Sequence, residues 1–115
     1  MPAPLPGIEH LDWQEGYFEN KDDHAGELET SVMMYYHPEL VNLDEAGEGT
    51  SKPFALSSLN AQIAWLPRYW SKVSADTGIG DPRKSTPEKG ERYAKAVIEK
   101  LALLFTEIGS KEVYL

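Results

Sequence analysis

The sequence predicts an α/β fold with two main helices and few short strands. Apolar residues recur at helical spacing in two segments, residues 25–36 and 87–108, and both segments begin with residues that favour a helix start. Strand candidates are limited to residues 72–77, which lead into a glycine-rich turn, and to the tail at 112–115. A length of 115 residues is typical of one domain with one core.

Composition excludes several classes of protein. The formal net charge of -8 argues against nucleic-acid binding and against an anionic membrane surface, because both need basic residues. No apolar run approaches the ~20 residues of a membrane span, and residues 1–7 lack the pattern of a signal peptide. The absence of cysteine excludes disulfides and thiolate zinc sites. We therefore expect a cytoplasmic protein with no membrane and no nucleic-acid partner.

Residues 1–21 are predicted to form a proline-rich, irregular arm. Three prolines among the first six residues impose extended backbone, either as a flexible arm or as a segment lying across a partner subunit. Trp13, Tyr17 and Phe18 would form an aromatic wall near a site or anchor a loop on the core, and anchoring is the preferred interpretation.

The first helix is expected over about residues 25–36, with Asp23 or His24 as its N-cap and Pro38 just beyond its end. Its apolar residues extend round more than one side, which predicts a helix buried on most faces. The following acidic segment, residues 42–52, is interpreted as a solvated loop in preference to a metal-binding loop, because it lacks the alternating acidic positions of a calcium loop.

Residues 65–70 form an aromatic cluster that Pro67 interrupts, so irregular structure is expected there. Arg68 would cap the core or, as the less favoured alternative, bind an anion or stack on a ring. The last helix is expected to start with Thr86 as N-cap and Pro87 at its first position, and to end at Gly109 in a left-handed cap.

The segment 22–31 is the best candidate for chemistry. It holds four carboxylates and one histidine directly before the apolar run 32–36, and buried carboxylates are costly unless they are paired. His24 is suited to accept and return a proton near neutral pH, although a histidine at a helix start can also serve only as a hydrogen-bonding group. Glu27 and Glu29 lie two residues apart and must face different directions, so they have different roles. Glu27 could reach His24, whereas Glu29 is expected to be buried and to accept hydrogen bonds from loop backbone.

The same segment resembles the creatininase (creatinine amidohydrolase) family. Members carry a His-Ala/Gly-Gly-x-x-Glu-Thr-Ser segment, matched by residues 24–31, and then a Pro-x-Leu-Val turn, matched by residues 38–41. A second match lies at residues 78–82, Gly-Ile-Gly-Asp-Pro, with Thr-Pro-Glu-Lys-Gly at residues 86–90. The resemblance implies that residues 22–115 form the C-terminal half of a creatininase-like, three-layer α/β/α domain.

The resemblance also implies a metal-dependent hydrolysis of a cyclic amide or another C–N bond. In the family, two divalent ions (zinc or manganese) generate hydroxide and polarise the carbonyl, and their ligands come mainly from the N-terminal half. The residues of this chain match neither ligand set, so we expect no metal ligand in it and no metal pair bound by the chain alone.

The resemblance carries a role over to His24 alone. His24 matches the family's proton-transfer histidine and is the expected catalytic residue, and Asp23, Glu27 and Glu29 are expected to contact the substrate or to orient residues that do. Glu29 could instead orient a metal-bound residue from the other half, and a role as a direct metal ligand is the less favoured alternative. Residues 20–23 differ from the substrate contacts of creatininases, which argues against creatinine itself.

The implied partners are a small-molecule substrate and either further copies of the chain or a complementary N-terminal half. Two alternatives remain open at this point. The chain could be a non-catalytic fragment or subunit, or an acidic protein-interaction module that docks a partner through its proline-rich arm and the 65–70 patch.

Overall fold

The computed structural model describes residues 16–115 and contains two main helices, as the sequence predicts. The first, α1 (Glu27–Tyr36), begins two residues later than expected, and the last, α4 (Pro87–Ser110), extends two residues further. Four short helical turns lie between them: η1 (Pro38–Leu40), η2 (Leu43–Glu45), α2 (Ser57–Asn60) and α3 (Trp70–Val73).

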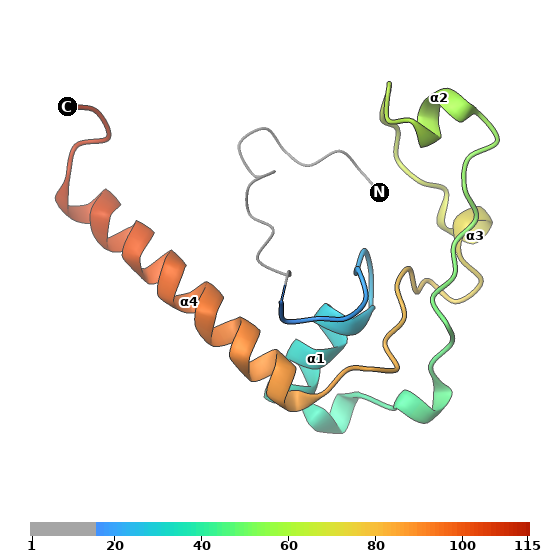
Figure 1. Ribbon diagram of the computed structural model, residues 1–115, viewed down its shortest axis with the longest axis horizontal. Coiled ribbons are helices and arrows are strands. Elements are labelled where there is room, and N and C mark those ends of the chain that lie inside the picture. Colours follow the sequence, from blue (N-terminus) through green and yellow to red (C-terminus); the bar gives the residue numbers. More distant parts are fainter. Residues whose placement is uncertain (1–15) are drawn as a thin grey trace.

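The first turns of α4 pack against α1, and the rest of α4 extends away from the other described elements (Figure 1). A side chain at Gly90 would collide with the backbone of Ser31, so glycine permits the close approach of the two helices. The contact is polar as well as close. The hydroxyl of Ser31 accepts a hydrogen bond from the backbone N–H of Thr86 at 3.2 Å, and Ser85 donates to the carbonyl of Glu27 at 3.2 Å.

Both strand predictions are wrong. Residues 72–77 contain the end of α3 and a turn, and residues 112–115 form no strand. In the first segment, Asp76 accepts hydrogen bonds from the backbone N–H of Gly78 at 3.1 Å, and Ser74 donates to the carbonyl of Gly78 at 2.8 Å. Such local bonds compete with strand pairing. Between residues 16 and 115, strand-like pairing is reduced to one isolated antiparallel bridge, between His24 and Ile79.

Few apolar side chains are buried. Among residues 16–115, the buried apolar residues are Ile79, Pro82 and Ala94, whereas Glu27 and Ser31 are fully buried. The expectation that α1 is buried on most faces is therefore wrong, since Met33 and Tyr36 are exposed. The three-layer arrangement implied by the resemblance remains a prediction.

The C-terminal half of α4 is uncovered along its apolar side. Helical backbone continues through Gly109, which does not adopt the predicted left-handed conformation, and the helix ends at Lys111 in extended backbone. We call the exposed apolar residues on this side the α4 face: Ile98, Leu101, Leu104, Phe105 and Ile108.

Two aromatic residues of the N-terminal segment pack on α4. The ring centroids of Tyr17 and Phe18 lie 5.7 and 5.3 Å from that of Tyr93, both in edge-to-face geometry. Burial raises the pKa of the Tyr93 hydroxyl. This favours the anchoring interpretation for Tyr17 and Phe18, while Trp13 and most of the predicted arm lie outside the described residues.

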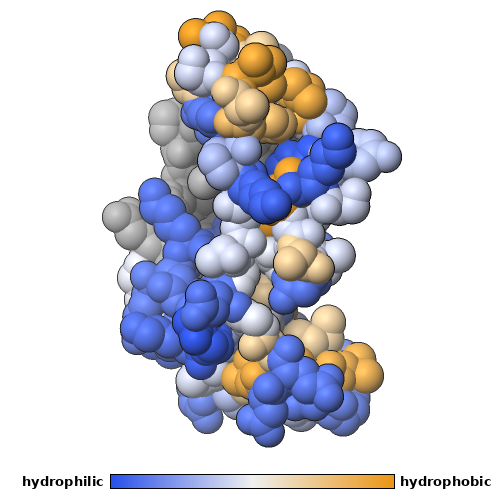
Figure 2. Space-filling view, turned by 90° about the vertical axis from the view of Figure 1, so that its right-hand side faces the viewer, coloured by the Kyte–Doolittle hydropathy of each residue, from blue (hydrophilic) through white to orange (hydrophobic). Residues whose placement is uncertain are grey.

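A second exposed apolar surface covers α2 and the segment after it. Figure 2 shows apolar side chains gathered at that end of the molecule, above a largely hydrophilic surface. Leu56, Ile63, Trp65 and Tyr69 are all exposed there. The described part of the chain has no helix long and apolar enough to cross a membrane.

Candidate functional site

The start of α1 is held by Asp22, a residue that the sequence analysis did not select as the cap. Its two carboxylate oxygens accept hydrogen bonds at 2.9 Å from the backbone N–H groups of Gly26 and of Glu29. Gly26 is the N-cap residue, so the prediction of Asp23 or His24 in that position is wrong. Because Asp22 bonds the free amides, Asp23 and His24 are available for other contacts.

His24 is fixed by both its backbone and its ring. Its N–H donates to the carbonyl of Ile79 at 2.8 Å, and its carbonyl accepts from the N–H of Ile79 at 2.8 Å. The ring atom Nδ1 lies 2.9 Å from the carbonyl oxygen of Thr77. A carbonyl can only accept a hydrogen bond, so Nδ1 must carry the proton. In the neutral ring, Nε2 then has a free lone pair that can accept a proton.

Two residues beside His24 adopt left-handed backbone. Ala25, the next residue, has φ of 54°, and Thr77, which bonds the ring, has φ of 71°. Left-handed backbone is unusual for a β-branched residue such as threonine and costs roughly 1–3 kcal/mol. Strain of this kind often occurs at functional sites. Left-handed backbone therefore occurs both at the residue that follows His24 and at the residue that binds its ring, which makes this position a candidate functional site.

Glu27 faces away from His24. It is fully buried and accepts hydrogen bonds from the N–H groups of Glu19 and Asn20, at 2.9 and 2.8 Å. Lys89 of α4 donates to it at 2.6 Å. The expectation that Glu27 reaches His24 is therefore wrong. Glu27, not Glu29, is the buried carboxylate that accepts hydrogen bonds from loop backbone, since residue 27 rather than residue 29 faces α4.

Asp23 forms an ion pair with Arg68. Each of its carboxylate oxygens accepts one hydrogen bond from the guanidinium, at 2.7 and 2.8 Å. The guanidinium also lies over the ring of Trp70, 4.9 Å from the ring centroid. Arg68 thus stacks on a ring, as one sequence-based alternative held, and its paired charge leaves it poorly suited to bind an anion.

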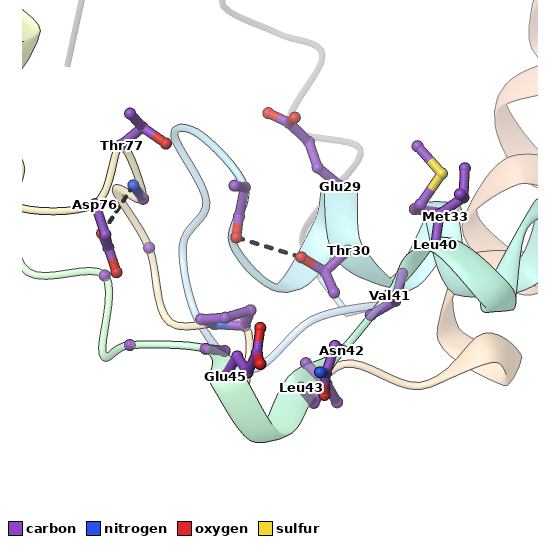
Figure 3. A pocket seen from close by; sticks show the side chains of 17 residues that line it. Glu29, Thr30, Met33, Leu40, Val41, Asn42, Leu43, Glu45, Asp76 and Thr77 are labelled. Atoms are coloured by element: carbon purple, nitrogen blue, oxygen red, sulfur yellow. Dashed lines mark hydrogen bonds between the residues drawn. The ribbon is translucent and has the colours of Figure 1, made fainter.

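Glu29 is exposed and lines a pocket of about 440 Å³, so the expectation that it is buried is wrong. In Figure 3, Glu29 and Thr30 come from α1, Glu45 from η2, and Asp76 and Thr77 from the turn before Ile79. The pocket therefore lies beside the backbone that holds His24. Part of the predicted solvated loop, residues 42–52, forms one of its walls.

The turn after Ile79 carries an exposed ion pair. The pKa of the Asp81 carboxyl falls from its ordinary 3.8 to about 2, because the side chain and the backbone N–H of Arg83 donate hydrogen bonds to it. Gly80 has φ of 124°, and its backbone lies so close to Gly49 that a side chain at residue 49 would collide with it. These contacts fix the segment that directly follows Ile79, the backbone partner of His24.

The described residues do not assemble a metal centre. Across residues 16–115, no three His, Asp or Glu side chains come together in a way that could hold a metal ion. The carboxylates near His24 are engaged elsewhere: Asp22 caps α1, Asp23 binds Arg68, and Glu27 binds Lys89. The donor set on this part of the chain therefore does not fit the metal pair that the resemblance implies.

Arg68, Trp70 and Thr77 are the residues around His24 that sequence reasoning missed as parts of its environment. Trp70 lies with its ring centroid 4.9 Å from that of His24. The sequence Asp76-Thr77-Gly78 is typical of an Asp-initiated turn and could have indicated where the carbonyl of Thr77 points. No local signal pairs Asp23 with Arg68, which lies 45 residues further on.

Comparison with known sequences decides the family. The sequence model of the creatininase family, described as creatinine amidohydrolase, matches residues 5–105. The chain belongs to the creatininase family. As a creatininase-family chain it is also similar to a solved structure from Bacteroides fragilis named "Putative creatinine amidohydrolase", with 59% sequence identity and a TM-score of 0.85.

That similarity covers 94% of the creatininase-family chain described here and 43% of the Bacteroides fragilis chain. The chain thus spans less than half the length of the solved relative. A search of curated proteins finds no match.

Proposed function

We propose that the chain supplies the proton-transfer residue of a metal-dependent amidohydrolase that acts on a cyclic amide or another C–N bond. Membership of the creatininase family supports the reaction class. The observation that carries the proposal is the geometry of His24, whose Nδ1 binds the carbonyl of Thr77 and whose Nε2 is left able to accept a proton.

Hydrolysis of an amide requires a proton to move between two places. The attacking water loses a proton as it adds to the carbonyl carbon, and the nitrogen gains one as the C–N bond breaks. Nε2 of His24 takes the first proton and returns it to the leaving nitrogen, which leaves the imidazole unchanged after each turnover. General acid–base catalysis of this kind contributes about 10²–10⁴-fold in rate.

The three neighbouring carboxylates have distinct proposed roles. Glu29 is exposed in the 440 Å³ pocket and contacts the substrate there. Asp23 and Glu27 act through the residues they bind: Asp23 holds Arg68, and Glu27 joins α1 to α4 through Lys89. Both carboxylates keep the segment around His24 in one conformation.

We place the metal ligands outside residues 16–115, since the donor set of the described residues does not fit a metal pair. Zinc or manganese is the cofactor that the family implies. The ligands are supplied by a complementary N-terminal half, which completes the site with a small-molecule substrate. The chain alone is then inactive.

A complementation assay tests this proposal. The chain is mixed with the part of the Bacteroides fragilis protein that it does not match, zinc or manganese is added, and a panel of cyclic amides is assayed. We expect turnover by the mixture, none by either part alone, and a loss of at least about 100-fold with His24→Ala. His37→Ala is the matched control, because His37 is an exposed histidine at the other end of α1.

Each outcome bears on a different element of the proposal. Turnover by the chain alone with added metal, abolished by His24→Ala, would show that copies of the chain assemble a complete site. Full activity of the His24→Ala mixture would overturn the role of His24. A complex that forms but hydrolyses no C–N bond would favour the alternative of a non-catalytic subunit.

A further inference from the structure

Four side chains contact one another in series: those of Asp23, Arg68, Trp70 and His24. Asp23 binds Arg68 through two hydrogen bonds of 2.7 and 2.8 Å, and the guanidinium of Arg68 lies 4.9 Å from the centroid of the Trp70 ring. The Trp70 ring centroid is in turn 4.9 Å from that of His24, with the two planes tilted by 58°. Asp23 and His24 are adjacent in the sequence, so the series begins and ends on the same two residues.

The first two members of the series are rigid for physical reasons. A guanidinium that donates two hydrogen bonds to one carboxylate is fixed in both position and plane. The side chains of Arg68 and Asp23 are only 19% and 15% exposed, so water competes weakly for these bonds. Because the guanidinium is fixed, the cation–π contact also restrains the indole of Trp70, which is otherwise 39% exposed.

The imidazole of His24, the last member of the series, needs such a restraint. The terminal torsion of a histidine side chain is broad, so one hydrogen bond at Nδ1 leaves the ring free to pivot about that bond. A second aromatic ring packed beside the imidazole limits the pivot. With Nδ1 bound to Thr77 and Trp70 in ring contact, Nε2 has one defined direction.

We propose that Arg68 and Trp70 are positioning residues for His24, and that Asp23 serves the reaction by holding Arg68. The use of this arrangement in proton transfer rests on the proposed function. The arrangement itself is a property of the folded chain and can be tested without turnover.

Nuclear magnetic resonance of histidine ring nitrogens provides the test. The chain has three histidines, so ¹⁵N labelling of histidine with His10→Gln and His37→Gln variants assigns the signals of His24. At a pH where the ring is neutral, the two nitrogen shifts report which nitrogen carries the proton, and nuclear Overhauser effects report contact with the indole. The chain unfolded in urea supplies the reference shifts.

We expect the native chain to show His24 protonated at Nδ1 and in contact with the indole of Trp70. Trp70→Leu and Arg68→Met are expected to move the two nitrogen shifts at least half of the way to the unfolded reference. Trp70→Phe keeps a ring beside the imidazole and is expected to retain the native shifts. Trp65→Leu is the matched control, since Trp65 is an exposed tryptophan of the same segment, and it should leave His24 unchanged.

Unchanged His24 shifts in folded Trp70→Leu would overturn the proposal, and so would equal shifts in Trp65→Leu. If Trp70→Leu does not fold, the comparison of Trp70→Phe with Arg68→Met decides, because native shifts in the second variant exclude a role for Arg68. In the complementation assay, Trp70→Leu should lower kcat about 10-fold or more with little change in KM. An inactive mixture with the expected nitrogen shifts would refute the proposed function and leave this inference standing.

Discussion

The segment around His24 buries polar side chains, whereas the α4 face leaves apolar side chains exposed to solvent. Around His24, the buried side chains are largely polar, and among the described residues no buried side-chain nitrogen or oxygen lacks a hydrogen-bond partner. Along the α4 face, regular helix presents leucine, isoleucine and phenylalanine to solvent. Figure 1 shows the same contrast in the positions of the two halves of α4, one beside α1 and one apart from it.

The difference shows which parts of the described chain are completed by contacts within the chain. The polar segment is completed by contacts within residues 16–115, such as Glu27 with Lys89 and Asp23 with Arg68. The α4 face has the pattern of a core helix but no described surface that covers it. Exposed apolar surface of this extent is typical of an interface. The contacts around His24 are therefore formed within the chain itself, whereas the α4 face is predicted to bind a partner.

The largest expected effect lies in the polar segment. Glu27→Gln removes the charge that Lys89 pairs with inside the protein, and breaking a buried ion pair costs about 3 kcal/mol in the free energy of unfolding. Glu29→Gln is the matched control, because Glu29 lies in the same helix but is exposed, and it should change this free energy by less than about 0.5 kcal/mol. Urea denaturation measures both. Equal effects of the two variants would show that burial does not distinguish them.

The two glycines of α4 provide the next comparison. Gly90→Ala introduces a methyl group against the backbone of Ser31 and should lower the free energy of unfolding by about 2 kcal/mol. Gly109→Ala has open space and a better helix former, and should raise it by a few tenths to about 1 kcal/mol. Thermal unfolding of both variants checks the opposite signs. A stabilising Gly90→Ala would mean that the two helices are not in close contact.

The α4 face should control assembly more than folding. We expect sedimentation at micromolar concentration to show self-association of the chain, and Phe105→Ser to weaken it about 10-fold or more, since truncation of a central aromatic residue in an interface costs more than about 1 kcal/mol. Glu99→Ser, an exposed polar change on the same helix, is the control. A well-folded monomer of the unaltered chain would contradict this prediction.

The smallest expected effect concerns the turn after Ile79. The pKa of Asp81 is lower in the folded chain, about 2, than its ordinary 3.8, so its contribution to stability is present above about pH 4 and is lost as the pH falls through about 2. Asp81→Asn should therefore flatten the loss of stability between pH 4 and 2. Thermal midpoints across this range measure the slope. Arg83→Gln should flatten it less than Asp81→Asn does, because the backbone N–H of residue 83 still donates to the carboxylate, and a steeper slope in either variant would contradict the assignment.

Much of the fold could be predicted from local signals. The cap at Thr86, the following Pro87 and the apolar periodicity locate α4, and the hydrogen bond from the N–H of Lys89 to the Thr86 hydroxyl confirms that start. The end of α4 was wrong, since a glycine is permitted but not required to leave the helix. The strands at 72–77 and 112–115 were wrong for a different reason: strand formation needs a partner, and local sequence carries no information about one.

The candidate site was predicted at the right segment but with the wrong internal contacts. Spacing along a helix correctly separates Glu27 from Glu29, yet it does not say which of the two faces α4. That choice depends on Lys89, which lies 62 residues from Glu27 in sequence, and on the neighbouring Gly90, which brings α4 close to one side of α1. Likewise, the environment of His24 depends on Arg68, Trp70 and Thr77, which only the folded chain brings together.

At the bridge between His24 and Ile79, the backbone conformation does not depend on the chemistry of the side chain. Both of its hydrogen bonds belong to the backbone, so they do not require an imidazole at residue 24 and are open to any residue there except proline. Related proteins can then exchange the imidazole for another group while they keep the surrounding architecture, and catalysis could be gained or lost in evolution by a single codon change. Under the proposed function, His24→Ala in the complemented protein would keep the backbone of the site and remove the proton-transfer group, so that a bound substrate would remain intact long enough to be identified.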